Sequence, residues 1–120
     1  MTKILGISLL AVLAASSFVI RAESVAPASP RRVEVTAQRY AFNPGVVTLK
    51  KGEPVILVLK SLDVSHGLRI RELGVEMKVS KGGTAEARFT PEKTGDFIAH
   101  CFVFCGAGHG TMTLTVHVVG

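Results

Sequence analysis

The segment 100–112 (HCFVFCGAGHGTM) holds the side chains of this chain that are best suited to bind a soft metal ion. It contains both cysteines of the protein, Cys101 and Cys105, together with His109 and Met112. Thiolate, imidazole and thioether form a ligand set that favours copper over hard cations. Because the spacing Cys-x3-Cys-x3-His-x2-Met is short, we expect one loop whose side chains converge on a single site.

A further candidate ligand, His66, lies upstream in the segment 63–67 (DVSHG), at the expected end of a strand. Alone, it would be interpreted as a structural histidine, but together with the loop it becomes a candidate ligand. Asp63 is expected to orient His66 through a hydrogen bond, as residues next to metal ligands commonly do. The remaining histidines, His100 and His117, are expected to point away from the metal.

The two cysteines could instead form a disulfide, which is the usual state of exported cysteines. A bridge between Cys101 and Cys105 would close only three intervening residues and would restrain little chain entropy. It would also leave the positions of His109 and Met112 unexplained. We therefore favour a metal site.

The ligand types indicate which metal this site would bind. Zinc accepts cysteine and histidine but rarely a thioether, whereas copper takes thiolate, imidazole and a weak methionine together. Two copper sites remain possible. In a binuclear site, both thiolates bridge two copper ions and each ion takes one histidine. A mononuclear blue-copper site would use His66, Cys105, His109 and Met112.

Short β-strands are the elements that must position these residues. Residues 33–37 and 84–89 alternate apolar and polar side chains, which is typical of half-buried strands, and 55–59 is an apolar run that suits a buried strand. Turn residues such as Asn, Pro and Gly separate the runs. About seven strands with frequent turns predict an all-β Greek-key β-sandwich. Further strands are expected at 46–49, 97–101 and 112–119, with a possible helical turn within 72–79.

The N-terminal segment differs from the rest of the chain. Residues 1–22 combine a short basic start with an apolar run, which predicts a signal peptide or a membrane-anchor helix. Either would export the remainder of the chain, so we expect a spacer over 23–32 and one copper-binding domain over 33–120. The part after residue 22 carries twelve basic and nine acidic residues. Its net charge of +3, without a basic cluster or a stacking motif, gives no indication of nucleic-acid binding.

The loop and the 63–67 segment resemble the binuclear copper A (CuA) domain of the cupredoxin superfamily, found in cytochrome c oxidase subunit II and at the end of nitrous oxide reductase. The resemblance covers residues 33–119. It implies a cupredoxin-like fold and two copper ions. The ligands that it implies are His66, Cys101, Cys105, His109, Met112 and the backbone carbonyl of Val103.

The resemblance implies an electron-transfer protein, and a complete ligand set without an open position predicts that it is not an enzyme on its own. The N-terminal segment predicts that it lies in the periplasm or on another extracytoplasmic face of the membrane. Its partner would be a redox protein, such as a c-type cytochrome or a haem-copper oxidase subunit. Two departures favour an alternative, a copper-delivery protein: Val103 stands where many oxidase subunits carry a glutamate, and the chain has no tryptophan. Phe102 and Phe104 are expected to shield the sulfurs from water.

Overall fold

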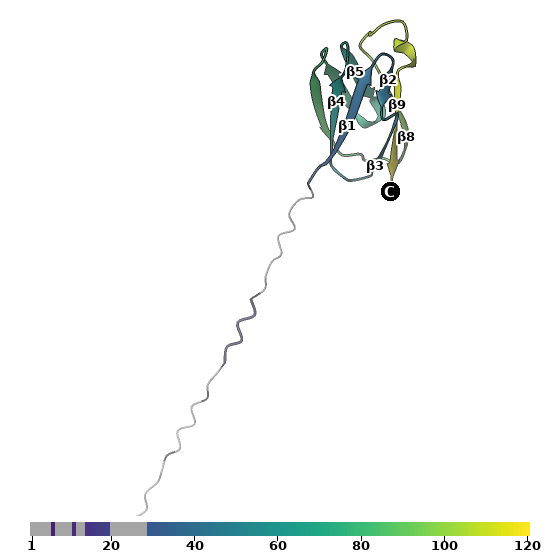
Figure 1. Cartoon of the computed structure of the whole chain (residues 1–120). Coiled ribbons are helices and arrows are strands. Elements are labelled where there is room, and N and C mark those ends of the chain that lie inside the picture. Colours follow the sequence, from purple (N-terminus) through teal and green to yellow (C-terminus); the bar gives the residue numbers. More distant parts are fainter. Residues whose placement is uncertain (1–5, 7–10, 12–13, 20–28) are drawn as a thin grey trace, which may run out of the picture.

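The computed structural model describes residues 29–120 without a break, together with residue 6, residue 11 and residues 14–19. In this part of the chain, nine β-strands and two 3-10 helices form. The strands make two sheets that pack face to face as a β-sandwich (Figure 1). The prediction of an all-β sandwich is confirmed.

The first sheet has four strands in the spatial order β2–β1–β4–β7. β1 and β4 run parallel, and the other neighbours are antiparallel. The central strand β4 is the predicted apolar run, and most of its residues are buried. The bounds are β1 (Arg31–Gln38), β2 (Ala41–Asn43), β4 (Val55–Ser61) and β7 (Thr84–Phe89).

The second sheet has five strands in the order β3–β9–β8–β5–β6. β3 and β9 are parallel, and the remaining pairs are antiparallel. The two 3-10 helices, η1 (Arg71–Leu73) and η2 (His109–Thr111), lie in connections between strands. The strand bounds are β3 (Val46–Lys50), β5 (His66–Ile70), β6 (Val75–Val79), β8 (Gly95–His100) and β9 (Thr113–Val119).

The register of β5 and β8 determines where the cysteine loop runs. His100, the last residue of β8, pairs with Arg69 of β5. Because these strands are antiparallel, the chain after His100 runs alongside the beginning of β5, where His66 lies. The loop 101–112 then returns to β9, so His66 and the loop share one end of the sandwich. Two segments that are far apart in sequence are thereby brought together.

Alternating side chains from both sheets fill the core. On β9, for example, Leu114, Val116 and Val118 are buried, while the intervening residues are more exposed. This period of two is the pattern that the sequence predicts for a strand with one buried face. The core continues to the loop end of the sandwich, because both cysteines and Met112 belong to the same cluster of buried residues. The candidate metal site is therefore an extension of the core.

Some predictions differ in detail from the structure. The helical turn expected within 72–79 is the short helix η1, and most of that segment is strand β6. The predicted helix over 1–22 falls largely outside the described residues, although 14–19 are described and have no regular secondary structure. Within the part that can be described, no helix is long and apolar enough to span a membrane. The signal peptide or anchor and the spacer over 23–32 stay predictions.

Candidate metal site

His66 is the first residue of β5, and its side chain is completely buried. Its Nε2 atom lies 2.6 Å from Oδ1 of Asp63. The backbone N–H of Arg39 donates to Oδ2 of Asp63 at 2.8 Å and, as the largest cause, lowers the pKa of this carboxyl group from 3.8 to about 2. Asp63 is therefore ionised at neutral pH and acts as an acceptor. In the neutral imidazole of His66, Nε2 then carries the hydrogen and Nδ1 keeps the lone pair.

Nδ1 of His66 is buried and has no hydrogen-bond partner among the described residues. A buried polar atom without a partner costs roughly 1–3 kcal/mol, so such atoms usually indicate a missing ligand or a functional role. Asp63 thus has the role that the sequence predicts for it. It directs the unprotonated ring nitrogen toward the interior of the site.

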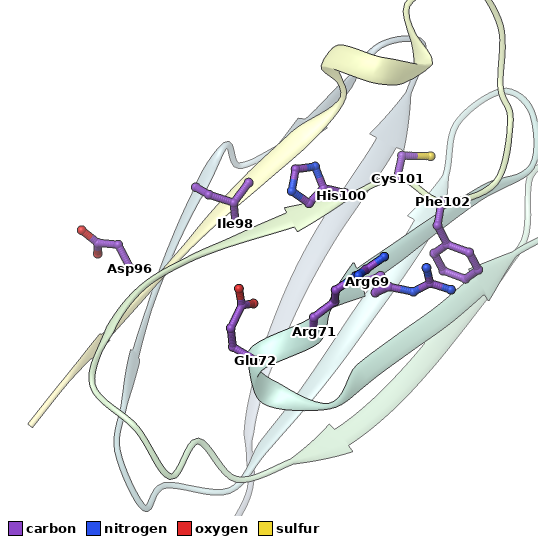
Figure 2. Close-up of a pocket in the computed structure, with 8 residues that line it drawn as sticks. All are labelled: Arg69, Arg71, Glu72, Asp96, Ile98, His100, Cys101 and Phe102. Atoms are coloured by element: carbon purple, nitrogen blue, oxygen red, sulfur yellow. The ribbon is translucent and has the colours of Figure 1, made fainter.

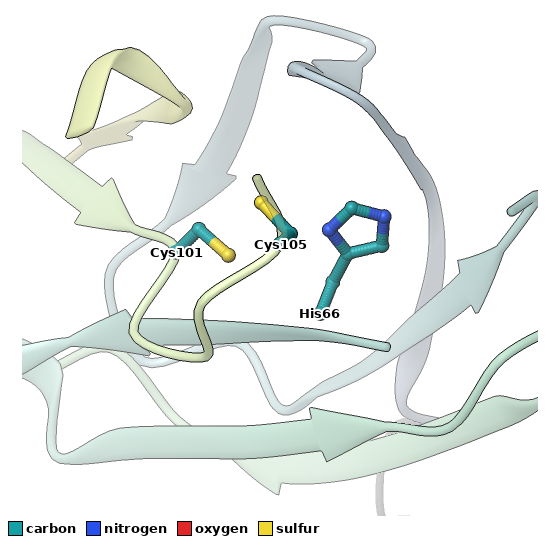
Figure 3. Close-up of side chains that lie close together, drawn as sticks. All are labelled: His66, Cys101 and Cys105. Atoms are coloured by element: carbon teal, nitrogen blue, oxygen red, sulfur yellow. The ribbon is translucent and has the colours of Figure 1, made fainter. Parts of the chain in front are cut away.

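Both cysteines are free thiols in the structure, and both are buried. His66, Cys101 and Cys105 each offer one ligand atom, and these three atoms lie within 4.8 Å of one another. Figure 3 shows these three side chains gathered in one space, His66 from β5 and the cysteines from the loop. The backbone carbonyl of Val103 points to the same place, because its oxygen accepts a hydrogen bond from the Cys101 thiol at 3.3 Å.

His109 and Met112 contact this group through Cys105. The Nδ1 atom of His109 lies 3.7 Å from the Cys105 sulfur, and the Met112 sulfur lies 3.8 Å from it. The helix η2 turns the chain between them, so that an imidazole and a thioether approach the same sulfur. All six residues predicted as ligands therefore lie around one small volume at the end of the core.

The electrostatics of the thiols depend on burial. Removal from water, as the largest cause, and the neighbouring Cys101, as the second, raise the pKa of the Cys105 thiol. The Cys105 thiol is thus held in the neutral form when no cation is near. A soft cation between the sulfurs would reverse this preference, because a coordinating thiol is deprotonated.

Gly67 allows the loop to pack closely on β5. A Cβ atom at this position would lie 2.8 Å from side-chain atoms of both Phe102 and Val103. The Phe102 ring also packs beneath the guanidinium of Arg69, 4.5 Å from the ring centre, as a cation–π pair. These contacts hold the first half of the loop, between the two cysteines, against the strand that carries His66.

The structure agrees with some of the expectations for neighbouring residues and corrects one. His100 and His117 are exposed, as expected. Phe102 is half-buried against Arg69, whereas Phe104 is 78% exposed and does not shield the sulfurs. The Phe104 ring instead lies beside the ring of His109, with the two ring centres 5.7 Å apart. Sequence reasoning also missed Arg39, which contacts the site although it lies far from the loop in sequence.

A surface cavity of about 670 Å³ lies beside Cys101 on the outer face of β5 and β8 (Figure 2). Its lining includes the basic side chains of Arg69 and Arg71 and the acidic side chains of Glu72 and Asp96. Arg69 is paired with Glu76 at 2.5 Å. Because the charges are mixed, the cavity offers no converging set of ligands comparable to that of the loop.

Comparison with known proteins gives the family. Residues 7–114 match the family described as cupredoxin-like domain, and this chain belongs to that family. It is 26% identical over 99 residues to cytochrome c oxidase subunit 2 of Thermus thermophilus, covering 81% of this chain and 73% of that protein. It is also 37% identical over 81 residues to the nitrous-oxide reductase of Cupriavidus necator. That match covers 64% of this chain but only 13% of the reductase.

Solved structures show the same fold. The periplasmic domain of subunit II of cytochrome oxidase from Bradyrhizobium japonicum superposes with a TM-score of 0.70 at 18% identity, covering 78% of this chain and 86% of that domain. A chain of a heme-copper terminal oxidase dimer superposes with a TM-score of 0.68 at 26% identity, covering 76% of this chain and 66% of that chain. The resemblance seen in the sequence is confirmed. The chain has a cupredoxin fold similar to that of cytochrome c oxidase subunit II, with a buried His/Cys/Cys group able to bind a metal.

Proposed function

We propose that this chain is a copper-binding electron-transfer protein with a binuclear CuA centre. The observation that carries the proposal is buried His66, whose Nδ1 atom has no hydrogen-bond partner and whose imidazole lies in one group with the two cysteine sulfurs. A metal ion would satisfy this nitrogen and both thiolates at once. The proposed ligands are His66, Cys101, Cys105, His109, Met112 and the backbone carbonyl of Val103.

The donor chemistry fits copper. Two sulfur thiolates, a thioether and imidazoles are soft or intermediate donors, which suit copper better than magnesium or calcium. Both thiols lie in the same group with His66, which favours a binuclear site over one that uses Cys105 alone. Copper bound there would supply one-electron transfer between partner proteins.

The residues of the chain would provide a rigid and dry environment for this chemistry. Asp63 fixes the tautomer and orientation of His66. Both cysteines are buried, so their sulfurs are shielded from water. The side chains of His66, Cys101 and Cys105 lie together in the folded chain, so little rearrangement would accompany a change of charge. A site of this type exchanges electrons rather than substrate, and we propose that the chain is not an enzyme on its own.

We further propose that the domain lies on the extracytoplasmic side of the membrane and exchanges electrons with a c-type cytochrome or a haem-copper oxidase subunit. The proposal is supported by the predicted signal or anchor over residues 1–22 and by relatives that are named as cytochrome c oxidase subunit 2. The exposed ring of Phe104, next to Cys105 in sequence, offers such a partner an apolar contact.

Metal analysis of the full chain tests this function. The chain, purified in detergent, is loaded with copper, and the metal content and electron paramagnetic resonance spectrum are measured. Two copper ions per chain with a delocalised mixed-valence spectrum are expected. One copper ion with an intense blue colour would support the mononuclear alternative. Rapid loss of copper to a thiol chelator without reversible redox cycling would support copper delivery, and bound zinc would contradict all three.

A further inference from the structure

Arg39, in the corner between β1 and β2, contacts both halves of the candidate metal site. Its backbone N–H donates to Oδ2 of Asp63 at 2.8 Å, and its side-chain Nε donates to the carbonyl oxygen of Cys105 at 3.2 Å. We infer that Arg39 is a positioning residue that holds the His66 half and the loop half of the site in one geometry. This inference rests on the proposed copper-binding function.

The first contact fixes the His66 half. Oδ1 of Asp63 accepts hydrogen bonds from the backbone N–H of Val64 and from His66, while Oδ2 accepts the one from Arg39. The Val64 and His66 donors belong to the same short segment as Asp63 and would move with it. The Arg39 N–H comes from the corner between β1 and β2 and ties the carboxylate to the first sheet. The orientation of the His66 imidazole is thereby fixed relative to the first sheet.

The second contact fixes the loop half between Cys105 and His109. Next to the hydrogen bond from Arg39 to Cys105, the Tyr40 ring packs directly on the backbone of Gly106 and Gly108. A Cβ atom at Gly108 would lie 2.5 Å from the Tyr40 ring, so only glycine permits this close approach. Gly106 also has a φ of 136°, which few other residues adopt. The Arg39–Tyr40 corner thus covers the backbone that connects a cysteine ligand to a histidine ligand.

The charge of Arg39 adds a second effect. Among the described residues, no side chain forms an ion pair with the Arg39 guanidinium. A positive charge beside the carbonyl of Cys105 stabilises negative charge on the site. Because reduction adds negative charge, Arg39 should favour the reduced form of the centre, and its removal should lower the reduction potential.

The test compares three variants of the full chain. Arg39→Met removes the guanidinium but keeps the backbone N–H and much of the side-chain volume. Arg39→Lys keeps the charge but loses the fixed geometry of Nε. Arg31→Met is the matched control, because Arg31 lies at the other end of β1 and also donates to a backbone carbonyl, that of Thr48 at 2.8 Å.

We expect Arg39→Met to release copper to a competing chelator about 10- to 100-fold faster, as is typical for the loss of a residue that orients ligands. The reduction potential of the centre should fall in Arg39→Met. Arg39→Lys should have the reduction potential of the wild type but release copper as fast as Arg39→Met. In the metal-free chain, the amides of 105–109 should exchange faster with solvent in Arg39→Met. Arg31→Met should match the wild type in all three measurements.

The outcomes separate the two proposals. If the wild type binds two copper ions and Arg39→Met equals Arg31→Met in release rate, potential and amide exchange, the role of Arg39 is wrong while the copper function stands. If the wild type binds no copper, the proposed function fails, and the positioning role fails with it. If Arg39→Met does not fold, an unchanged release rate in Arg39→Lys would equally contradict the inference.

Discussion

The hydrogen bond between Asp63 and His66 determines which ring nitrogen of His66 is free to bind a metal ion. The 2.6 Å contact between Oδ1 of Asp63 and Nε2 of His66 places the hydrogen on Nε2 and leaves Nδ1 as a buried acceptor without a partner. A carboxylate that holds a histidine in this way fixes its tautomer and its ring plane. The sequence feature that carries this relationship is the three-residue spacing within the segment 63–67.

Asp63→Asn should change how stability depends on pH in the metal-free chain. The pKa of Asp63 is lowered from 3.8 to about 2 in the folded state, so its stabilising contribution is fully present above pH 3.8 and is lost as the pH falls toward 2. The side chain is 31% exposed, and solvent screening reduces the effect. We expect the free energy of unfolding of the wild type to exceed that of Asp63→Asn at pH 6, and this difference to be about 1 kcal/mol smaller at pH 2.

Urea titrations of both proteins at several pH values measure this difference. Glu92→Gln, which removes an exposed carboxyl group far from the site, serves as the control. A gap between wild type and Asp63→Asn that stays constant from pH 6 to pH 2 would show that the carboxylate is not held in its ionised form.

Gly67→Ala should destabilise the metal-free chain. The added Cβ atom would lie 2.8 Å from Phe102 and Val103, so the first half of the loop must move away from β5. Overpacking of this kind costs about 1–3 kcal/mol in the free energy of unfolding. Gly45→Ala is the control, because a Cβ atom there meets no other atom within 4 Å. Equal midpoints of urea unfolding for the two variants would argue against close packing at Gly67.

Much of the fold can be predicted from the sequence, because alternation reports which face of a strand is buried. The runs at 84–89 and 112–119 alternate clearly and are the strands β7 and β9. Strand β2 has three residues, too few to establish a period. Strand β5 combines His66 and Gly67 with only two large apolar residues, both buried, and it has a neighbouring strand on each side. Its sequence therefore lacks a clear pattern.

The candidate side-chain ligands could be predicted because four of the five lie within one short segment, where the spacing itself restricts geometry. Arg39 could not, because it lies 24 residues from Asp63 and 66 from Cys105, and only the packing of the two sheets brings them together. The exposure of Phe104 likewise depends on the path of the loop beyond the sandwich. Contacts across the two sheets thus require the tertiary structure.

His109→Ala should reduce copper binding, whereas His100→Ala should leave it unchanged. The His109 ring approaches the Cys105 sulfur to 3.7 Å, whereas His100 lies on β8 with its side chain exposed. We expect His109→Ala to bind copper in reduced amount with an altered spectrum, and His100→Ala to bind two copper ions as the wild type does. Copper content and visible absorption measure both. A loss of copper in His100→Ala comparable to that in His109→Ala would contradict the ligand assignment.

Met112→Leu should change the reduction potential without loss of copper. The thioether is the weakest donor of the set, and removal of a donor destabilises the oxidised form, so the potential should rise. Because leucine has a similar volume, the free energy of unfolding should change by less than about 1.5 kcal/mol. Met77→Leu, another buried methionine in β6, is the control and should leave the potential unchanged. An equal potential in both variants would exclude Met112 as a ligand.

The binuclear character of the site is tested most directly by the electron paramagnetic resonance spectrum of copper-loaded Cys101→Ser. The sulfurs of Cys101 and Cys105 lie in one group with His66, and in a binuclear centre both sulfurs bridge the two ions. The proposal therefore predicts that Cys101→Ser loses the delocalised mixed-valence spectrum and binds fewer copper ions per chain. A Cys101→Ser protein that keeps the copper spectrum and metal content of the wild type would contradict the binuclear centre.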